Sequence, residues 1–247
     1  MLIGKGLGGS GVLNAMLYVR CVEADLLRWN ITNWTWEYAL HLYKSLEYYH
    51  LYPNESLPYY RGHTTGAVST TRPLYVDPIA SDFVASAVAS GILPSHDFNA
   101  PNRRIGAGYY DFTIEGGVRD SAAKKFLGPI LKSKPESFSL LLKSTASKIL
   151  LESQHGRKRA IGVEYMSNNE AKHVYLSDRG GDVIVCAGAL MTPKLLMNSG
   201  IGPRSELEKA KIDVKVALEH VGKHLVDHPA LAMVFEITSD AAASMSV

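Results

Sequence analysis

The sequence has few of the features that would set a chain apart from ordinary globular proteins. Its 247 residues include two cysteines, Cys21 and Cys186, which are too few for a disulfide framework, and Cys186 is expected to be a small core residue. No apolar run is long enough to cross a bilayer, so we expect no membrane span. A formal net charge of +2 gives no argument for a nucleic-acid partner. The nine histidines show no metal-ligand spacing, so we expect no metal site.

A complete dinucleotide-binding unit is also absent. Such a unit consists of a strand, a G-x-G-x-x-G turn and a helix, with an acidic residue about 20 residues later. The glycine-rich run over residues 4–9 has no strand before it, and its spacing differs from this motif. The sequence therefore lacks the turn that normally holds the pyrophosphate of a dinucleotide.

The most informative stretch that is present runs from Val183 to Pro203. Its β-branched beginning, residues 183–187, predicts a buried strand, and Gly188 allows a tight turn after it. Thr192 is a predicted helix cap, with Pro193 at the first helical position. A strand, a glycine turn and a helix N-terminus can present backbone N–H groups to an anionic ligand, but an ordinary strand–helix connection looks the same.

The rest of the chain shows weaker local patterns. Residues 57–82 are rich in Pro, Gly, Thr and Tyr and are predicted to be extended and loop-rich. The end of the chain, residues 240–247, is expected to be frayed. Apolar spacing and turn residues predict helices over 79–91 and 118–134, a strand over 138–152, and a hairpin formed by 160–165 and 171–176.

Residues 188–203 resemble the second sequence signature of the glucose–methanol–choline (GMC) family of flavin oxidoreductases. Every constrained position is filled, by Gly188, Ala189, Thr192, Pro193, Leu195, Leu196, Ser199, Gly200, Ile201 and Gly202. Residues 4–20 resemble the first signature, and residues 97–127 keep the order of the family between the two. Residues 221–229 resemble the family sequence Val-Gly-x-Asn-Leu-x-Asp-His-Pro, with His224 in place of the Asn. The resemblance covers nearly the whole chain.

The resemblance implies an α/β fold, α+β in part. It would be an incomplete flavoprotein fold of the FAD/NAD(P)-binding type with accessory antiparallel strands. Residues 1–247 would form part of a GMC FAD-binding domain, with residues 57–82 contributing to the substrate-domain side. The implied cofactor is FAD, and the implied substrate of the full-length protein is a small-molecule alcohol.

The family also implies which residues would bind FAD. Its first signature lies along the flavin, and glycines there let the backbone approach a ligand without interference from a Cβ atom. The segment that matches Asn14 to Leu17 runs beside the isoalloxazine ring, and Ala146 matches a position whose backbone meets the adenine. The cofactor-binding candidates are therefore Gly8, Gly9, Ser10, Asn14, Ala15, Met16, Leu17, Ala146 and Gly188.

Arg119 and Ser121 lie in the middle of the family-like region and allow two interpretations. They are either an anion site or residues that tie down a loop before a helix. The second arrangement is the more common one in proteins.

No catalytic residue is assigned. The general base of the family, a His with a His or Asn partner, matches positions beyond residue 247. We therefore expect the chain to represent the middle of a GMC protein. Three functions remain open: an FAD-dependent oxidoreductase acting on the CH–OH group of an alcohol, a non-catalytic remnant without FAD binding of its own, and a flavin-dependent offshoot like the algal fatty-acid photodecarboxylases.

Overall fold

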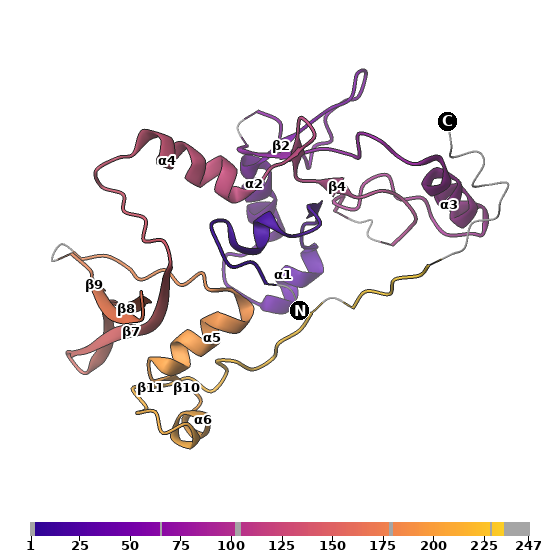
Figure 1. Cartoon of the computed structure of the whole chain (residues 1–247). Coiled ribbons are helices and arrows are strands. Elements are labelled where there is room, and N and C mark those ends of the chain that lie inside the picture. The colour runs from indigo at the N-terminus through magenta and orange to yellow at the C-terminus, as the bar shows by residue number, and fades with distance from the viewer. Residues whose placement is uncertain (1–2, 65, 102–104, 178–179, 228, 235–247) are drawn as a thin grey trace. The chain divides into compact units, whose positions relative to one another are not determined.

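The computed structural model describes residues 3–64, 66–101, 105–177, 180–227 and 229–234 (Figure 1). The end of the chain that was expected to be frayed, 240–247, lies outside these residues. Helices and strands are both present, which confirms a mixed α/β chain. The chain forms two compact units, of which one ends at Phe138 and the other begins at Ser139.

The first unit consists of short helices and three two-stranded pairs. β1 pairs antiparallel with β4, β2 pairs parallel with β3, and β5 pairs antiparallel with β6. Its helical elements are η1 (Gly9–Val12), α1 (Glu23–Trp29), α2 (Trp36–Leu46), α3 (Pro78–Ala89), η2 (Ala123–Leu127) and α4 (Gly128–Ser133). Its strands are β1 (Leu17–Tyr18), β2 (Glu47–Tyr49), β3 (Val68–Thr70), β4 (Asp111–Phe112), β5 (Ile114–Glu115) and β6 (Val118–Arg119).

Of the two helices predicted in this unit, one is confirmed and the other is wrong in part. The helix expected over 79–91 is confirmed as α3, because Asp77 caps its first turn by accepting a hydrogen bond from the Ile79 N–H. The helix expected over 118–134 is wrong in its first part. Residues 118–119 pair with β5 instead, and helical structure begins at Ala123.

The centre of the first unit is polar. Arg20, Glu47 and Arg61 have exposed fractions of 2%, 1% and 1%. Arg61 donates to Glu47 Oε1 at 2.6 Å, to the two oxygens of Asp97 at 2.7 and 3.0 Å, and to Asp111 Oδ2. Arg20 donates to Glu47 Oε2 at 2.5 Å. The two guanidinium groups thus pair with three carboxylates, so every buried charge of this cluster has an opposite partner.

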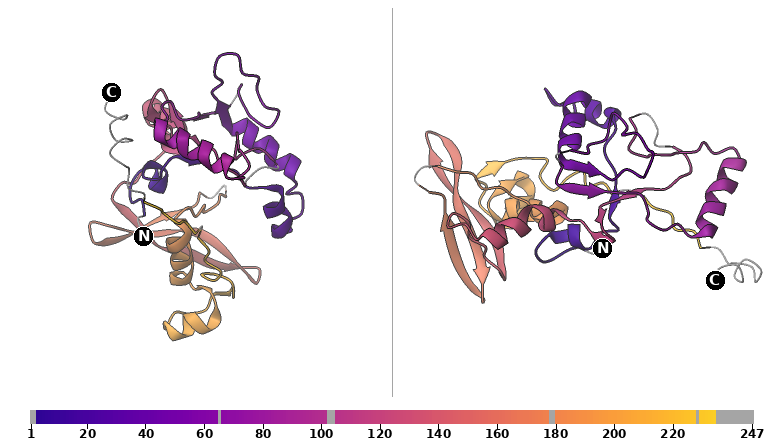
Figure 2. Two further views of the ribbon diagram at one scale, coloured as in Figure 1. Left: turned by 90° about the vertical axis from the view of Figure 1, so that its right-hand side faces the viewer. Right: turned by 90° about the horizontal axis from the view of Figure 1, so that it is seen from above.

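The second unit contains a three-stranded antiparallel sheet in the order β7-β8-β9. Figure 2 shows the long strands of this sheet. The predicted hairpin is confirmed, with Asn168 and Asn169 at φ +52° and +63°, as a tight two-residue turn requires. The strand expected from residue 138 begins only at Ser144. The elements of this unit are β7 (Ser144–Gln154), β8 (Arg157–Ser167), β9 (Glu170–Tyr175), α5 (Gly188–Asn198), β10 (Ile201–Gly202), α6 (Arg204–Lys209) and β11 (Val216–Ala217), with β10 and β11 parallel.

Three predictions around residue 188 are wrong. Residues 183–187 form no strand, because no described strand pairs with them, and an unpaired strand leaves its backbone groups without partners. Cys186 is exposed rather than in the core. The helix begins at Gly188 instead of at a Thr192 cap, so Pro193 lies inside α5.

Ser199 fastens the end of α5 to β7. Its Oγ accepts a hydrogen bond from the buried Ile149 N–H at 2.7 Å and donates to the Leu195 carbonyl at 2.6 Å. Ile149 and Leu195 are two of the buried apolar residues of this unit. The hydroxyl therefore provides a hydrogen-bond partner both for an amide of β7 and for a carbonyl in the last turn of α5.

Ser199→Ala is expected to lower the free energy of unfolding by about 1–3 kcal/mol, because the buried Ile149 N–H loses its acceptor. Urea denaturation measures the change. The matched control is Ser153→Ala, which removes an exposed hydroxyl that accepts from Lys158 Nζ and should stay within about 0.5 kcal/mol of the wild type. Equal stability of Ser199→Ala and wild type would contradict the fastening role.

Candidate functional site

The glycine-rich loop at the start of the first unit has an unusual backbone. Gly8 and Gly9 lie at φ +90° and +52°, in the left-handed region that glycine adopts most readily. The helical structure that follows Gly8 is the single turn of η1 (Gly9–Val12). Ser10 Oγ accepts a hydrogen bond from the Gly4 N–H at 3.1 Å, which closes the loop on itself.

One side of this loop is packed and the other is open. A Cβ atom added to Gly8 would lie 2.6 Å from Val12 Cγ1 and 2.9 Å from Ala123 Cβ, so this side needs glycine. A Cβ atom added to Gly9 or Gly11 would meet nothing within 4 Å. The open side is therefore a bare backbone surface that a ligand can approach closely.

Two leucines that follow the glycines in the chain are exposed. Leu13 is 64% exposed and Leu17 is 47% exposed, so both can offer apolar surface to a ligand. A bare backbone followed by exposed leucines suits a flat ligand with apolar faces and a polar edge. The isoalloxazine ring of FAD has this chemistry, so the residues present fit the cofactor that the resemblance implies.

Asn14 organises the second half of the loop. Its Oδ1 accepts a hydrogen bond from the Met16 N–H at 3.0 Å, and Met16 lies at φ +62°. A left-handed residue other than glycine costs about 1–2 kcal/mol, so this conformation must be held by its neighbours. The Nδ2 of Asn14 has no hydrogen-bond partner among the described residues, which leaves a donor for a ligand.

Thr113 holds the strained Met16 from the other side. Both its N–H, at 2.8 Å, and its Oγ1, at 3.3 Å, donate to the Met16 carbonyl. The next residue, Leu17, pairs with Phe112 in the β1–β4 ladder. Met16 and Leu17 are thus fixed by backbone partners that lie about a hundred residues later in the chain.

The guanidinium of Arg119 holds Asn14. Nη1 donates to Asn14 Oδ1 at 2.7 Å, Nη2 donates to the Asn14 carbonyl at 2.8 Å, and a longer bond of 3.4 Å reaches the Gly11 carbonyl. The structure therefore favours the loop-tie interpretation of Arg119. Ser121 takes no part in it, because its Oγ accepts from the Lys124 N–H.

Asn99 fixes the backbone that follows the loop. Asn99 donates from Nδ2 to the Tyr18 carbonyl at 3.0 Å and accepts from the Arg20 N–H at 2.8 Å. Burial raises the pKa of Tyr18 and of Asp111 above their usual values, although the nearby arginines act in the opposite direction. Burial, and then Asp97, raise the pKa of Tyr60 to about 12.

The two remaining candidates, Ala146 and Gly188, belong to the second unit. Ala146 is exposed on β7, pairs with Tyr165 and lies next to a register shift. Gly188 lies at φ +85° and is the first residue of α5, whose N-cap residue, Ala187, makes no side-chain capping bond. The first amides of α5 therefore lack a side-chain partner, as an anion site at a helix N-terminus requires.

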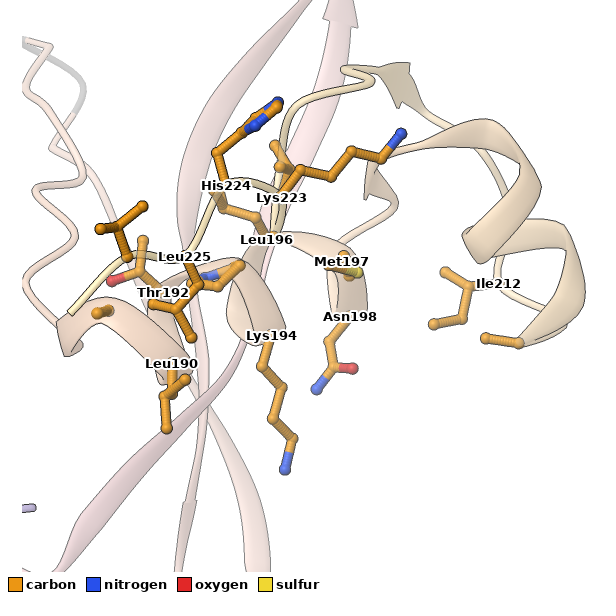
Figure 3. Close-up of a pocket in the computed structure, with 16 residues that line it drawn as sticks. Leu190, Thr192, Lys194, Leu196, Met197, Asn198, Ile212, Lys223, His224 and Leu225 are labelled. Carbon is orange, nitrogen blue, oxygen red and sulfur yellow. The ribbon is translucent and has the colours of Figure 1, made fainter. Parts of the chain in front are cut away.

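A groove of about 790 Å³ lies between α5 and residues 221–226 in the second unit (Figure 3). Its lining is largely apolar, with Lys194, Lys223 and His224 as its basic residues. Figure 3 shows Lys194 and Asn198 extending to one side and Lys223 and His224 to the other. Because these polar groups do not converge on one point, we assign no ligand to the groove.

His224 lies at φ +59°. Asn, Asp and His adopt the left-handed conformation more readily than other side chains, which explains how His takes the place of the Asn in the resembling family sequence. The neighbouring His228 lies outside the described residues.

Two negative findings hold for the described residues alone. They contain no group of three or more His, Cys, Asp or Glu side chains that could hold a metal ion. None of their helices is both long and apolar enough to span a membrane.

Comparison with known proteins gives consistent matches. The family model described as GMC oxidoreductase matches residues 1–230. The alcohol dehydrogenase (acceptor) of Pseudomonas putida is 34% identical over 228 residues, which are 91% of this chain and 39% of the relative. The chloroplastic fatty acid photodecarboxylase of Chlamydomonas reinhardtii is 32% identical over 232 residues, which are 93% of this chain and 37% of the relative.

A solved structure agrees with these sequence matches. The FAD-dependent oxidoreductase from Chaetomium thermophilum superimposes with a TM-score of 0.77 and 27% identity, over 88% of this chain and 38% of that chain. The chain spans less than half the length of each of these relatives.

Proposed function

The chain belongs to the GMC oxidoreductase family, and on that premise we propose that residues 8–17 form the flavin-facing wall of an FAD-dependent oxidoreductase. The observation that carries the proposal is the open backbone at Gly9, together with the strained conformation in which Met16 is held in the same loop. Strained residues that their surroundings hold in place cluster at ligand sites. The whole loop lies within residues 1–230, which the family model matches.

We propose a role for each part of the loop. Gly8, Gly9 and Ser10 let the backbone approach the ring, and the Nδ2 of Asn14 donates a hydrogen bond to its polar edge. Ala15, Met16 and Leu17 line the apolar face. In the second unit, Ala146 contacts the adenine through its backbone, and Gly188 opens the N-terminus of α5 toward the cofactor.

For the full-length protein we propose oxidation of an alcohol CH–OH group to a carbonyl. FAD, when bound, supplies the acceptor for the hydride that leaves the alcohol carbon. The residues of this chain bind and orient the ring and keep water from its covered face. None of them is assigned as the base that takes the hydroxyl proton.

A second candidate reaction rests on the similarity to the Chlamydomonas photodecarboxylase, which is close to that of the Pseudomonas alcohol dehydrogenase, at 32% and 34% identity. The two reactions differ in their need for light. Bleaching of the flavin by alcohols in the dark supports the oxidoreductase, whereas light-dependent loss of carbon dioxide from a fatty acid supports the alternative.

A fluorescence titration tests the proposal. Adding the 247-residue chain to FAD should quench the flavin fluorescence to saturation. Riboflavin should also be quenched, since the proposed wall contacts the ring rather than the pyrophosphate. Unchanged fluorescence of both flavins would support a remnant without FAD binding of its own.

A further inference from the structure

We propose that Arg119 is a positioning residue that locks the flavin-facing loop in its binding conformation before the cofactor arrives. This inference rests on the proposed function, because it concerns the same loop. Arg119 lies on β6, 105 residues away in sequence from Asn14, and is only partly exposed. It was not among the cofactor-binding candidates.

The geometry is that of a two-pronged clamp. Nη1 and Nη2 bond to two oxygens of the same residue, Asn14 Oδ1 and the Asn14 carbonyl, at 2.7 and 2.8 Å. These oxygens belong to different groups, so the clamp fixes the side chain and the backbone of Asn14 together. Only a planar guanidinium presents two donors in this fixed arrangement.

The clamp acts on the strained residue. Asn14 Oδ1 also accepts the hydrogen bond from the Met16 N–H, so Arg119 orients the acceptor that holds Met16 at φ +62°. Thr113, which holds the Met16 carbonyl, lies just before the β5–β6 hairpin that carries Arg119. One short segment, residues 113–119, therefore holds the loop at both Asn14 and Met16.

The guanidinium of Arg119 bonds to Asn14 rather than to a carboxylate. Among the described residues, no carboxylate lies within ion-pair distance of its guanidinium. The nearby Glu115 and Asp120 pair with Lys124 and Lys125 instead. The bonds from Arg119 to Asn14 are therefore charge-assisted and do not compete with an acidic partner.

Three variants of the 247-residue chain test the clamp. Arg119→Gln should weaken FAD binding about tenfold, the loss expected from about 1.4 kcal/mol of loop ordering. Arg119→Lys keeps the positive charge but loses the planar pair of donors, so it should restore the affinity for FAD only in part. Lys124→Gln removes a nearby positive charge that makes no contact with Asn14, and it should bind FAD as the wild type does.

Two further readouts separate positioning from general stability. Without FAD, the amides of residues 14–17 should exchange hydrogen several-fold faster in Arg119→Gln than in the wild type. The melting temperatures of Arg119→Gln and Lys124→Gln should agree, because neither side chain is buried.

The outcomes also separate this inference from the proposed function. If the wild-type chain binds FAD and Arg119→Gln binds it equally well, Arg119 does not position the loop. The proposal that residues 8–17 form the flavin-facing wall is then unaffected. Full rescue by Arg119→Lys would also overturn the clamp, since charge alone would then suffice. If the wild-type chain binds no flavin, the proposed function itself fails.

Discussion

Replacing Arg61 with methionine is expected to lower the free energy of unfolding by about 3–5 kcal/mol, which is the usual cost of breaking a buried ion pair on one side. Arg61 is 1% exposed and donates to Glu47, Asp97 and Asp111. Methionine has a similar length but no donor, so it leaves buried carboxylates without their partner. Urea denaturation at neutral pH measures the loss.

The loss should depend on pH in a defined direction. Burial raises the pKa of Asp111 above its usual value, and Arg61 is the main group that lowers it. Removing Arg61 therefore raises this pKa further in the folded state. A raised carboxyl pKa contributes stability below the unfolded pKa of about 4, and this stability is lost as pH rises through the folded pKa. The deficit of Arg61→Met should therefore shrink as the solution is acidified from neutral pH.

Arg72→Met is the matched control. Arg72 donates to Glu55 at 2.6 Å, but the side chains of this pair are 38% and 31% exposed. Such a pair is worth about 0–1 kcal/mol after solvent screening, so the control should lose no more than that. Equal effects of the two replacements, or a deficit of Arg61→Met that grows on acidification, would contradict the role of the buried charge cluster.

Gly9→Val is expected to abolish measurable FAD binding. A side chain at Gly9 meets no protein atom within 4 Å, so it projects into the open face that is proposed to take the ring. The left-handed backbone of Gly9, at φ +52°, adds about 1–2 kcal/mol of strain for a residue with a Cβ atom. Equilibrium dialysis against FAD measures the affinity.

Gly156→Val separates strain from position. Gly156 also has a left-handed backbone, at φ +76°, and open space around a Cβ atom, but it lies in the turn between β7 and β8. Gly156→Val should therefore lose similar stability and keep its FAD affinity. If both variants bind FAD alike, the loop over residues 8–17 does not face the flavin.

The features that the sequence predicted correctly depend on neighbours in the chain. The hairpin of β8 and β9 follows from two runs around Asn168 and Asn169, and α3 follows from helical apolar spacing that ends at Gly91. Turn residues and helix caps act over a few residues, so they can be read from a single sequence.

The features that were predicted wrongly or not at all depend on distant partners. Residues 183–187 have strand-like composition, but no described strand pairs with them, so composition alone misled the prediction. The clamp of Arg119 on Asn14 joins residues 105 positions apart. The charge cluster joins Arg61 to Asp111 across 50 positions. Without the fold, nothing in the sequence shows which arginine meets which carboxylate.

The claim that residues 8–17 face the flavin is tested most directly by amide hydrogen exchange of the 247-residue chain with and without FAD. We expect slower exchange over residues 8–17 when FAD is bound, and unchanged exchange over the exposed strand β9 (Glu170–Tyr175). If saturating FAD leaves exchange over residues 8–17 unchanged, these residues do not face the flavin.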